Sequence, residues 1–555
     1  MRRVWTTLAP LLVLLPLPGS LECRAEGVTF ESLSAEGAGS KSLREGIKLA
    51  GEFFKWEAEA EARKPNAAAK KVAAMKSFRD WLDGTKDSAG QDLRKFPGVV
   101  IEVLDRGRAS SLATPTKGKL VYSSVETPGV SRGRFEYTTL VPKNYNQKND
   151  TRTPIVIALH GRVIDVRHPA FRGNTKIFTE RSRQVVHDYY LGNVLGDEYL
   201  VVAPTGTPNG FNYKVSQADE RQYEERQALF LALGHALSAY RSDWHRVWLD
   251  LQGSALRLAC EQGLIFTGIV LRDREDDRKP FLPPEEAFML ENLNGMPLIY
   301  VADEKTWGEL GSVVSDWLTK VYTKAGKLEN LLVFKVPRDA TGALQADPQK
   351  VAEFMAKHKS PVARTDIQWR FFNPDMAAPP PHELIRAMYN YDVSDAARKQ
   401  PLEAKAGGLH LRVMRETFTD AEGKAMPQNV IHLDISEAEA IRLRLSDGFV
   451  DLDLPVTVVV NGKVVQDKVK IERNWELFEQ LVLPRRFFML PFVAELEFEF
   501  GYKPRFSPPP PPAPPAEGGG EKPPEPPGGE AGDKPPPPGE ADRGGAVREP
   551  DRDHP

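Results

Sequence analysis

The chain has 555 residues, which is long enough for about two or three domains around a large buried core. Its 74 basic and 77 acidic residues nearly cancel, and the net charge of -3 gives no reason to expect a nucleic acid or an anionic membrane as partner. The histidines are dispersed, no cysteine pair has the spacing of metal ligands, and no glycine-rich phosphate loop occurs. We therefore expect no cofactor and no transition-metal site.

The first 25 residues have the pattern of a signal peptide. Arg2 and Arg3 precede an apolar core, Val4–Leu17, which is too short and too interrupted by proline to span a bilayer. Cleavage after Ala25 predicts an exported protein, located in the periplasm, in the cell envelope or outside the cell, with Cys260 as its remaining cysteine. Lipid modification of Cys23 is the alternative, although the residue before it is not the small one that such processing prefers.

Residues 26–97 form a helical region in this interpretation. Apolar residues recur at helical spacing in Ile47–Trp56 and again in Val72–Leu82, and no motif accompanies them. A helical cap or stalk on the main domain is the simplest prediction. The pattern then changes, and short strands are predicted at Val99–Leu104, Lys119–Ser124 and Arg134–Val141.

Residues 98–365 alternate between buried strands and helices. The strands are apolar on both faces, as expected in a parallel sheet covered on each side. They are predicted at Ile155–Leu159, Leu200–Ala203, Val247–Leu251, Ile265–Val270, Leu298–Val301 and Leu331–Val336, with helices at Glu220–Tyr240, Leu310–Tyr322 and Pro348–Lys357. The alternation predicts an α/β fold with a doubly wound, mainly parallel sheet.

The segment Val247–Ala259 combines a strand, a tight turn of small residues and a helix. This is the layout of a nucleophile elbow, which needs small residues two positions before and after the nucleophile because strand and helix approach closely. With Ser254 as nucleophile those positions hold Gln252 and Leu256, which are large. With the elbow one residue earlier, the nucleophile position is Gly253, which has no side chain.

Residues 366–502 are predicted to contain a linker and a small β domain, an Ig-like or similar sandwich of antiparallel strands. Asn461-Gly462 between Val456–Val460 and Val464–Ile471 indicates a type I′ hairpin, and one helix is expected at Trp475–Leu483. Three acidic residues, Asp447, Asp451 and Asp453, fit either a calcium site or, more simply, a solvated strand edge. Residues 503–555 are rich in proline, glycine and glutamate, which predicts a disordered, solvated tail, with a role as spacer or cell-envelope tether as the functional alternative.

Four short motifs together resemble the α/β-hydrolases of the secreted bacterial esterase, polyhydroxybutyrate-depolymerase and prolyl-oligopeptidase-like type. They are Pro142 with Tyr145, His160-Gly161, Ala203-Pro204 and Asp243 with Val247, within residues 134–360. Residues 429–500 further resemble a small β domain that follows such hydrolases in some bacteria. The resemblance implies an oxyanion region at His160 and Gly161 and a serine–histidine–acid triad.

The triad positions that the resemblance implies hold other residues. After the strand at Pro297–Val301 the acid's place is taken by Lys305, with Asp303 nearby, and after the next strand Thr341 stands where a histidine is expected. Of the remaining histidines, His358 is expected on the solvated surface and His382 is the one other base to consider. We expect a catalytically inactive pseudo-hydrolase with a binding or scaffold role, whose partner is a protein or an ester or other small molecule. The alternative is an active serine esterase or peptidase using Ser254 in an atypical elbow.

Overall fold

The protein is described by a computed structural model. The described residues are 30, 37–61, 64–87, 90–111, 115–126, 134–147, 152–159, 183, 185–205, 229, 231–237, 239–273, 284–293, 295–339, 343–360, 365–371, 391–393, 407–436, 440–481 and 492–499. The chain divides into two units after Tyr502. The predicted signal peptide and the proline-rich tail lie outside the described residues.

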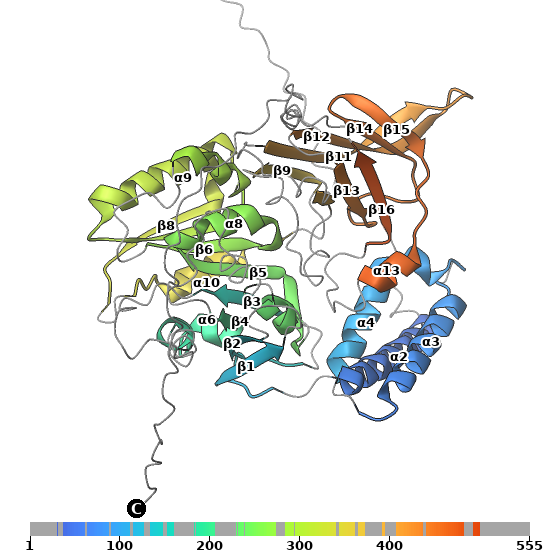
Figure 1. Ribbon diagram of the computed structural model, residues 1–555, viewed down its shortest axis with the longest axis horizontal. Coiled ribbons are helices and arrows are strands. Elements are labelled where there is room, and N and C mark those ends of the chain that lie inside the picture. Colours follow the sequence, from blue (N-terminus) through green and yellow to red (C-terminus); the bar gives the residue numbers. More distant parts are fainter. Residues whose placement is uncertain are drawn as a thin grey trace, which may run out of the picture. The chain divides into compact units, whose positions relative to one another are not determined.

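In the described part of the N-terminal region the chain forms three α-helices: α2 (Gly37–Glu61), α3 (Ala67–Gly84) and α4 (Pro97–Ser111) (Figure 1). The prediction of a strand at Val99–Leu104 is wrong, because these residues lie in α4. The run of β-branched residues is buried on almost every side, so it lacks the periodicity that separates a helix from a strand. Pro97 at the first helical position was the signal for a helix.

Gly107 lies where α4 crosses α2. A Cβ atom there would lie 2.4 Å from the Cβ atom of Ala50 and 2.7 Å from the carbonyl oxygen of Ile47, so the helices approach closely only because residue 107 is glycine. We expect Gly107→Leu to lower the free energy of unfolding by about 3 kcal/mol through overpacking, measured by urea unfolding. Gly98→Ala in the same helix meets nothing within 4 Å and is the matched control. A Gly107→Leu protein as stable as the control would contradict this packing.

Buried charges join α4 to the main domain. The guanidinium of Arg108 donates hydrogen bonds to Asp105 Oδ1 (2.7 Å) and to the carbonyl oxygen of Leu237 (2.9 Å), and Arg152 Nε donates to Asp105 Oδ2 (3.1 Å). Burial favours the protonated carboxyl of Asp105, but Arg108 and Arg152 outweigh it and hold its pKa below the ordinary value. The helical region is therefore anchored by paired charges as well as by apolar contact.

The main domain contains an eight-stranded sheet in the order β1-β2-β4-β3-β5-β6-β7-β8. Only β2 runs antiparallel to the other strands. The six predicted parallel strands are confirmed in this one sheet, although β6 begins at Gly268 rather than Ile265. The strands are β1 (Leu120–Glu126), β2 (Arg134–Leu140), β3 (Thr153–Ala158), β4 (Leu200–Pro204), β5 (Ser242–Gln252), β6 (Gly268–Arg272), β7 (Leu298–Asp303) and β8 (Leu331–Val336).

Two separate hydrophobic cores cover the two faces of this sheet. Alternate residues of β5 belong to different cores: Leu249 packs with α8 (Leu256–Gln262) and α9 (Ser312–Lys324), whereas Trp248 packs with α6 (Val194–Glu198) and α10 (Pro348–Ala356). The sheet is therefore doubly wound, as predicted, and its order with a single antiparallel second strand is that of the α/β-hydrolase fold.

Short 3-10 and π segments occur in the main domain and in the N-terminal region: Leu93–Lys95, Val186–Tyr190, Gly253–Ala255, Gly263–Ile265, Pro284–Leu293, Trp307–Gly311 and Leu328–Asn330.

The C-terminal region contains two smaller sheets, in the orders β10-β13-β16 and β15-β14-β12-β11-β9. The hairpin is confirmed, with positive φ at Asn461 (48°) and Gly462 (76°) as a type I′ turn requires. The expectation of antiparallel strands throughout is wrong at one pair, because β12 and β14 are parallel. Between them the chain crosses to the other sheet as β13 and returns in the same direction.

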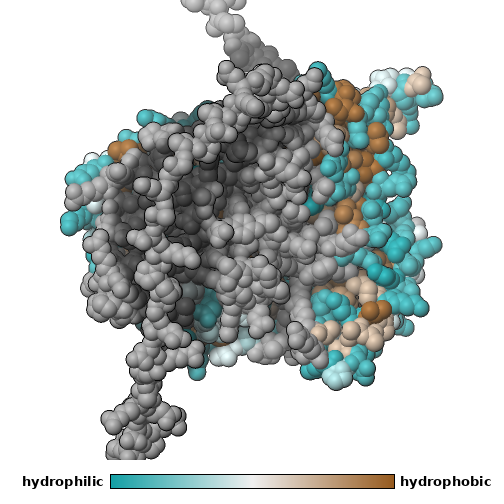
Figure 2. All heavy atoms as spheres, in the orientation of Figure 1, coloured by the Kyte–Doolittle hydropathy of each residue, from teal (hydrophilic) through white to brown (hydrophobic). Residues whose placement is uncertain are grey.

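The bounds of these elements are β9 (Asp366–Phe371), β10 (Tyr391–Val393), β11 (Gly407–Thr419), β12 (Ala425–Ser436), β13 (Ala440–Leu445), β14 (Val456–Val460), β15 (Lys463–Val469), β16 (Ala494–Glu499) and the predicted helix, α13 (Trp475–Leu481). Exposed apolar side chains are found on the edge strand β15, at Val464 and Val465, where Lys463 and Lys468 accompany them as charged edge residues. Hydrophobic residues gather over the C-terminal strands in the visible face (Figure 2).

Among the described residues, no helix is both long and apolar enough to cross a membrane.

Candidate active site

The turn at the end of β5 is the first element of the expected site. β5 ends at Gln252, residues Gly253–Ala255 form a 3-10 turn, and α8 begins at Leu256. A 3-10 turn has negative φ throughout, and Gly253 is not among the described glycines with positive φ. The strained backbone of a nucleophile elbow is therefore not present here. The side chain of Ser254 and the oxyanion residues His160 and Gly161 lie outside what the structure describes.

The next element is the carboxyl end of β7, where Asp303 is buried. Its Oδ2 accepts a hydrogen bond from Arg338 Nε (2.7 Å), and its Oδ1 accepts one from the backbone N–H of Lys305 (2.9 Å). The side chain of Lys305 is exposed. Arg338 lies two residues after the end of β8, the strand after which the resemblance implied a histidine. A carboxylate–guanidinium pair therefore occupies the neighbouring strand ends of β7 and β8.

Asp273, which follows β6, extends this cluster. Its Oδ1 accepts a hydrogen bond from Tyr300 Oη (2.7 Å), and its Oδ2 accepts one from the backbone N–H of Asp303 (2.9 Å). Burial raises the pKa of Asp273, and the nearby carboxylate of Asp303 adds to the rise, while these hydrogen bonds and Arg338 oppose it. Both aspartates are thus held in place by internal partners. Thr341 lies outside the described residues.

A second buried ion pair lies between β5 and β6. Arg272 Nε and Nη2 donate to Asp250 Oδ1 and Oδ2 (both 2.8 Å), and the hydroxyl of Tyr190 also donates to Asp250 Oδ2. The Arg272 guanidinium lies 4.2 Å from the ring centroid of Tyr189. Burial opposes the charge on Arg272, but Asp250 and the tyrosines outweigh it and raise its pKa well above the ordinary value. The bidentate contact with Asp250 therefore favours the charged form of the Arg272 guanidinium.

Neither His245 nor His358 lies at the carboxyl end of β5. His245 lies in the first half of β5, roughly 20 Å of strand away from the turn. His358 was expected on the solvated surface; it is instead half-buried, and its ring lies tilted against Phe354 (4.6 Å between ring centroids) and edge-on to Trp248 (6.4 Å). Burial lowers the pKa of His358. His382 lies outside the described residues.

The three acidic residues considered for calcium are paired with arginines. Arg473 donates to Asp447 Oδ1 (2.5 Å) and Oδ2 (3.1 Å) and to Asp453 Oδ1 (2.8 Å), and Arg415 donates to Asp451 Oδ2 (2.8 Å). The sequence left open whether these carboxylates bind calcium or face water. In the structure, arginine guanidinium groups pair with all three of them. No group of three or more His, Cys, Asp or Glu side chains that could hold a metal was found among the described residues.

Sequence reasoning missed Arg338 and the Asp250–Arg272 pair. A signal was available for the second, because Asp250 interrupts an apolar strand and Arg272 ends the next one, and buried charges need partners. Nothing local marked Arg338, which follows Asp303 by 35 residues.

The strand order, the two covered faces and the strand–turn–helix after β5 define an α/β-hydrolase-like protein. No family model matches the sequence, and no curated protein matches it either. Among solved structures the chain is similar to an arylesterase (11% identity, TM-score 0.28, covering 46% of this chain and 89% of that one). It is also similar to esterase 2 of Thermogutta terrifontis (12% identity, TM-score 0.26, covering 44% and 94%).

A variant of the AtxE2 isopeptidase is a third similar structure, at 12% identity and a TM-score of 0.27. The match covers 43% of this chain and 39% of the isopeptidase. At these identities and TM-scores the similar structures do not define an activity for this chain. The order and direction of its own strands define its fold.

Proposed function

We propose that this chain is an exported α/β-hydrolase-like protein that does not hydrolyse esters or peptides and instead binds a protein or small-molecule partner. The observation that carries the proposal is the buried Asp303–Arg338 pair. In a serine hydrolase the acid orients a histidine, which takes the proton of the nucleophile. A guanidinium stays protonated at any physiological pH and so cannot act as that base.

The turn after β5 supports the same proposal. Its 3-10 backbone lacks the strain that presents a nucleophile above the sheet, and Gly253 has no side chain to offer. The competing function is a serine esterase or peptidase that uses Ser254, and it is favoured by the retained strand–turn–helix arrangement. The two functions differ in whether Ser254 is an activated nucleophile.

We expect the purified protein not to hydrolyse p-nitrophenyl acetate or butyrate above a heat-denatured control, and not to react with a fluorophosphonate probe. Any trace rate should be the same in the Ser254→Ala protein, because Ser254 is not an activated nucleophile in this proposal. If it were, its loss would lower turnover by several orders of magnitude. An active esterase assayed in parallel shows that the substrates and the probe are competent. Robust turnover that Ser254→Ala abolishes would contradict the proposal and establish the esterase.

Export is part of the proposal and rests on the charged and apolar pattern of residues 1–25. We expect a bacterial host to release the full chain from the cytoplasm and to retain a chain that lacks these residues, measured by cell fractionation. Equal retention of both chains would refute export.

A further inference from the structure

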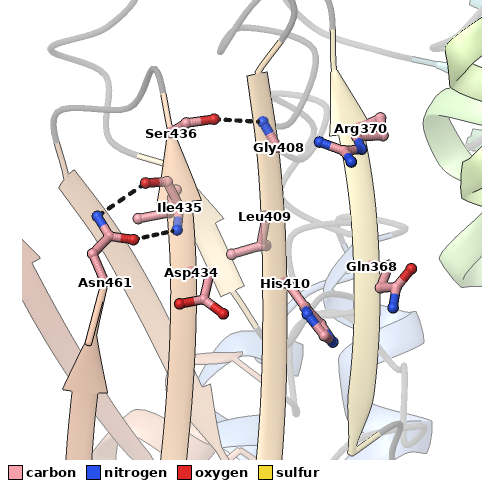
Figure 3. Close-up of a pocket in the computed structure, with 9 residues that line it drawn as sticks. All are labelled: Gln368, Arg370, Gly408, Leu409, His410, Asp434, Ile435, Ser436 and Asn461. Carbon is pink, nitrogen blue, oxygen red and sulfur yellow. Dashed lines mark hydrogen bonds between the residues drawn. The ribbon is translucent and has the colours of Figure 1, made fainter.

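A groove of about 430 Å³ lies on the outward face of the five-stranded C-terminal sheet, across β9, β11 and β12 (Figure 3). Successive residues of a strand point to opposite faces. Leu409 and Leu411 of β11 are buried in the core, whereas Gly408 and His410 belong to the outward face and line the groove. The groove is separate from the hydrolase-like site, which lies at the carboxyl ends of β5 to β8.

The strand register places the groove's polar side chains in two rows. Gly408 lies opposite Ser436 on one side and Arg370 on the other, and His410 lies in the same way between Asp434 and Gln368. A Cβ atom at Gly408 would lie only 2.9 Å from Nη1 of Arg370. The missing side chain therefore lets the guanidinium extend over the strand and forms the floor of the groove.

These rows present both hydrogen-bond donors and acceptors, and their charges balance. Arg370 is positive; its Nε donates to Glu291 Oε2 (3.2 Å), and the remaining N–H groups of the guanidinium are donors at the groove. The carboxylate of Asp434 accepts and is negative, half exposed and 3.7 Å from the nearest nitrogen of Arg412. Ser436 Oγ accepts from the backbone N–H of Gly408 (3.1 Å), which leaves its hydroxyl proton to donate outward. His410 Nε2 is 3.0 Å from Asp366 Oδ1, which orients the ring.

This composition selects among ligand classes. An apolar ligand would remove water from the donors and acceptors of the groove that have no protein partner, at a cost of about 1–3 kcal/mol for each group. A polyanion would meet the carboxylate of Asp434, and a polycation would meet Arg370. Hydroxyl groups both donate and accept, so a neutral ligand that carries many of them satisfies both kinds of side chain.

We propose that this groove binds a neutral oligosaccharide, and the inference deepens the proposed function by naming a ligand class for its binding role. The residues that line the described groove include no phenylalanine, tyrosine or tryptophan, and the one ring among them is the imidazole of His410, so hydrogen bonds rather than stacking on a large ring hold the sugar. The size of the groove lies within the range of small-ligand sites, about 300–1,000 Å³.

The test is isothermal titration of the full chain with cellotriose, xylotriose and triacetylchitotriose, and with tri-galacturonate as the charged comparison. We expect saturable binding of at least one neutral trisaccharide, weakened at least tenfold by Asp434→Ala and by Gly408→Val. The valine suits a strand and meets only the movable end of Arg370, so it fills the groove without a backbone clash. Glu416→Ala, on the same face of β11 outside the groove, is the matched control and should bind as the unchanged protein does.

Three results would overturn the proposal: no binding of any neutral trisaccharide at concentrations up to about 10 mM, binding that neither groove variant weakens, or tighter binding of tri-galacturonate. Thermal unfolding of each variant confirms that it is folded. Ester hydrolysis measured on the same samples separates the two proposals. Turnover would refute the proposed lack of activity without changing the titrations, and absent sugar binding would leave the hydrolysis prediction intact.

Discussion

Replacing Arg272 by methionine should lower the free energy of unfolding by about 3–5 kcal/mol, because it leaves the buried carboxylate of Asp250 without its cation. The side chains of Arg272 and Asp250 are 12% and 6% exposed, so water cannot replace the lost partner. Among the described residues, the hydroxyl of Tyr190 is the one other side-chain donor to this carboxylate. The pair therefore holds β5 and β6 together at their carboxyl ends only while both charges are present.

Urea unfolding at neutral pH measures this effect. The double variant Asp250→Asn/Arg272→Met should recover a large part of the loss, because the uncompensated charge has been removed. Lys324→Met breaks the surface pair between Lys324 and Glu291, whose side chains are 77% and 37% exposed, and should change stability by less than about 1 kcal/mol. If Arg272→Met behaved like that control, Asp250 would not depend on the ion pair.

Lowering the pH from 7 to 4 should destabilise the protein through His245. Burial lowers the pKa of this histidine from 6.5 to about 4, and the cations Lys359 and Arg152 add to the effect, while Asp243 opposes it. The folded state therefore holds the imidazole neutral, whereas the unfolded chain takes up a proton below its ordinary pKa. The stabilisation is complete above pH 6.5 and is lost as the pH falls through 4, in total on the order of 3 kcal/mol.

The measurement compares the free energy of unfolding at several pH values for the unchanged protein and for His245→Gln. Glutamine does not titrate, so the variant should lose roughly 3 kcal/mol less than the unchanged protein over this range. His187→Gln, the same substitution at an exposed position, is measured in parallel as the control. Parallel pH curves for the unchanged protein and His245→Gln would show that the buried imidazole is not the group that titrates.

Most of the fold could be predicted because its signals are local. The strands of the central sheet are short and apolar on both faces, and the Asn461-Gly462 turn needs positive φ that these two residues tolerate. Where burial extended around a whole element, as in α4, the same apolar run misled the prediction. The parallel pairing of β12 with β14 could not be predicted either, since it depends on a crossing through the other sheet.

The sequence by itself determined that a strand, a small-residue turn and a helix meet at Gly253, and that Lys305 and Thr341 stand where an acid and a base were expected. Only the tertiary structure decided what surrounds that turn. It brought Arg338 to Asp303 and Arg272 to Asp250, because buried charges find partners through space rather than along the chain. The same is true of the groove, whose rows exist only once the register sets Arg370, Gly408 and Ser436 side by side.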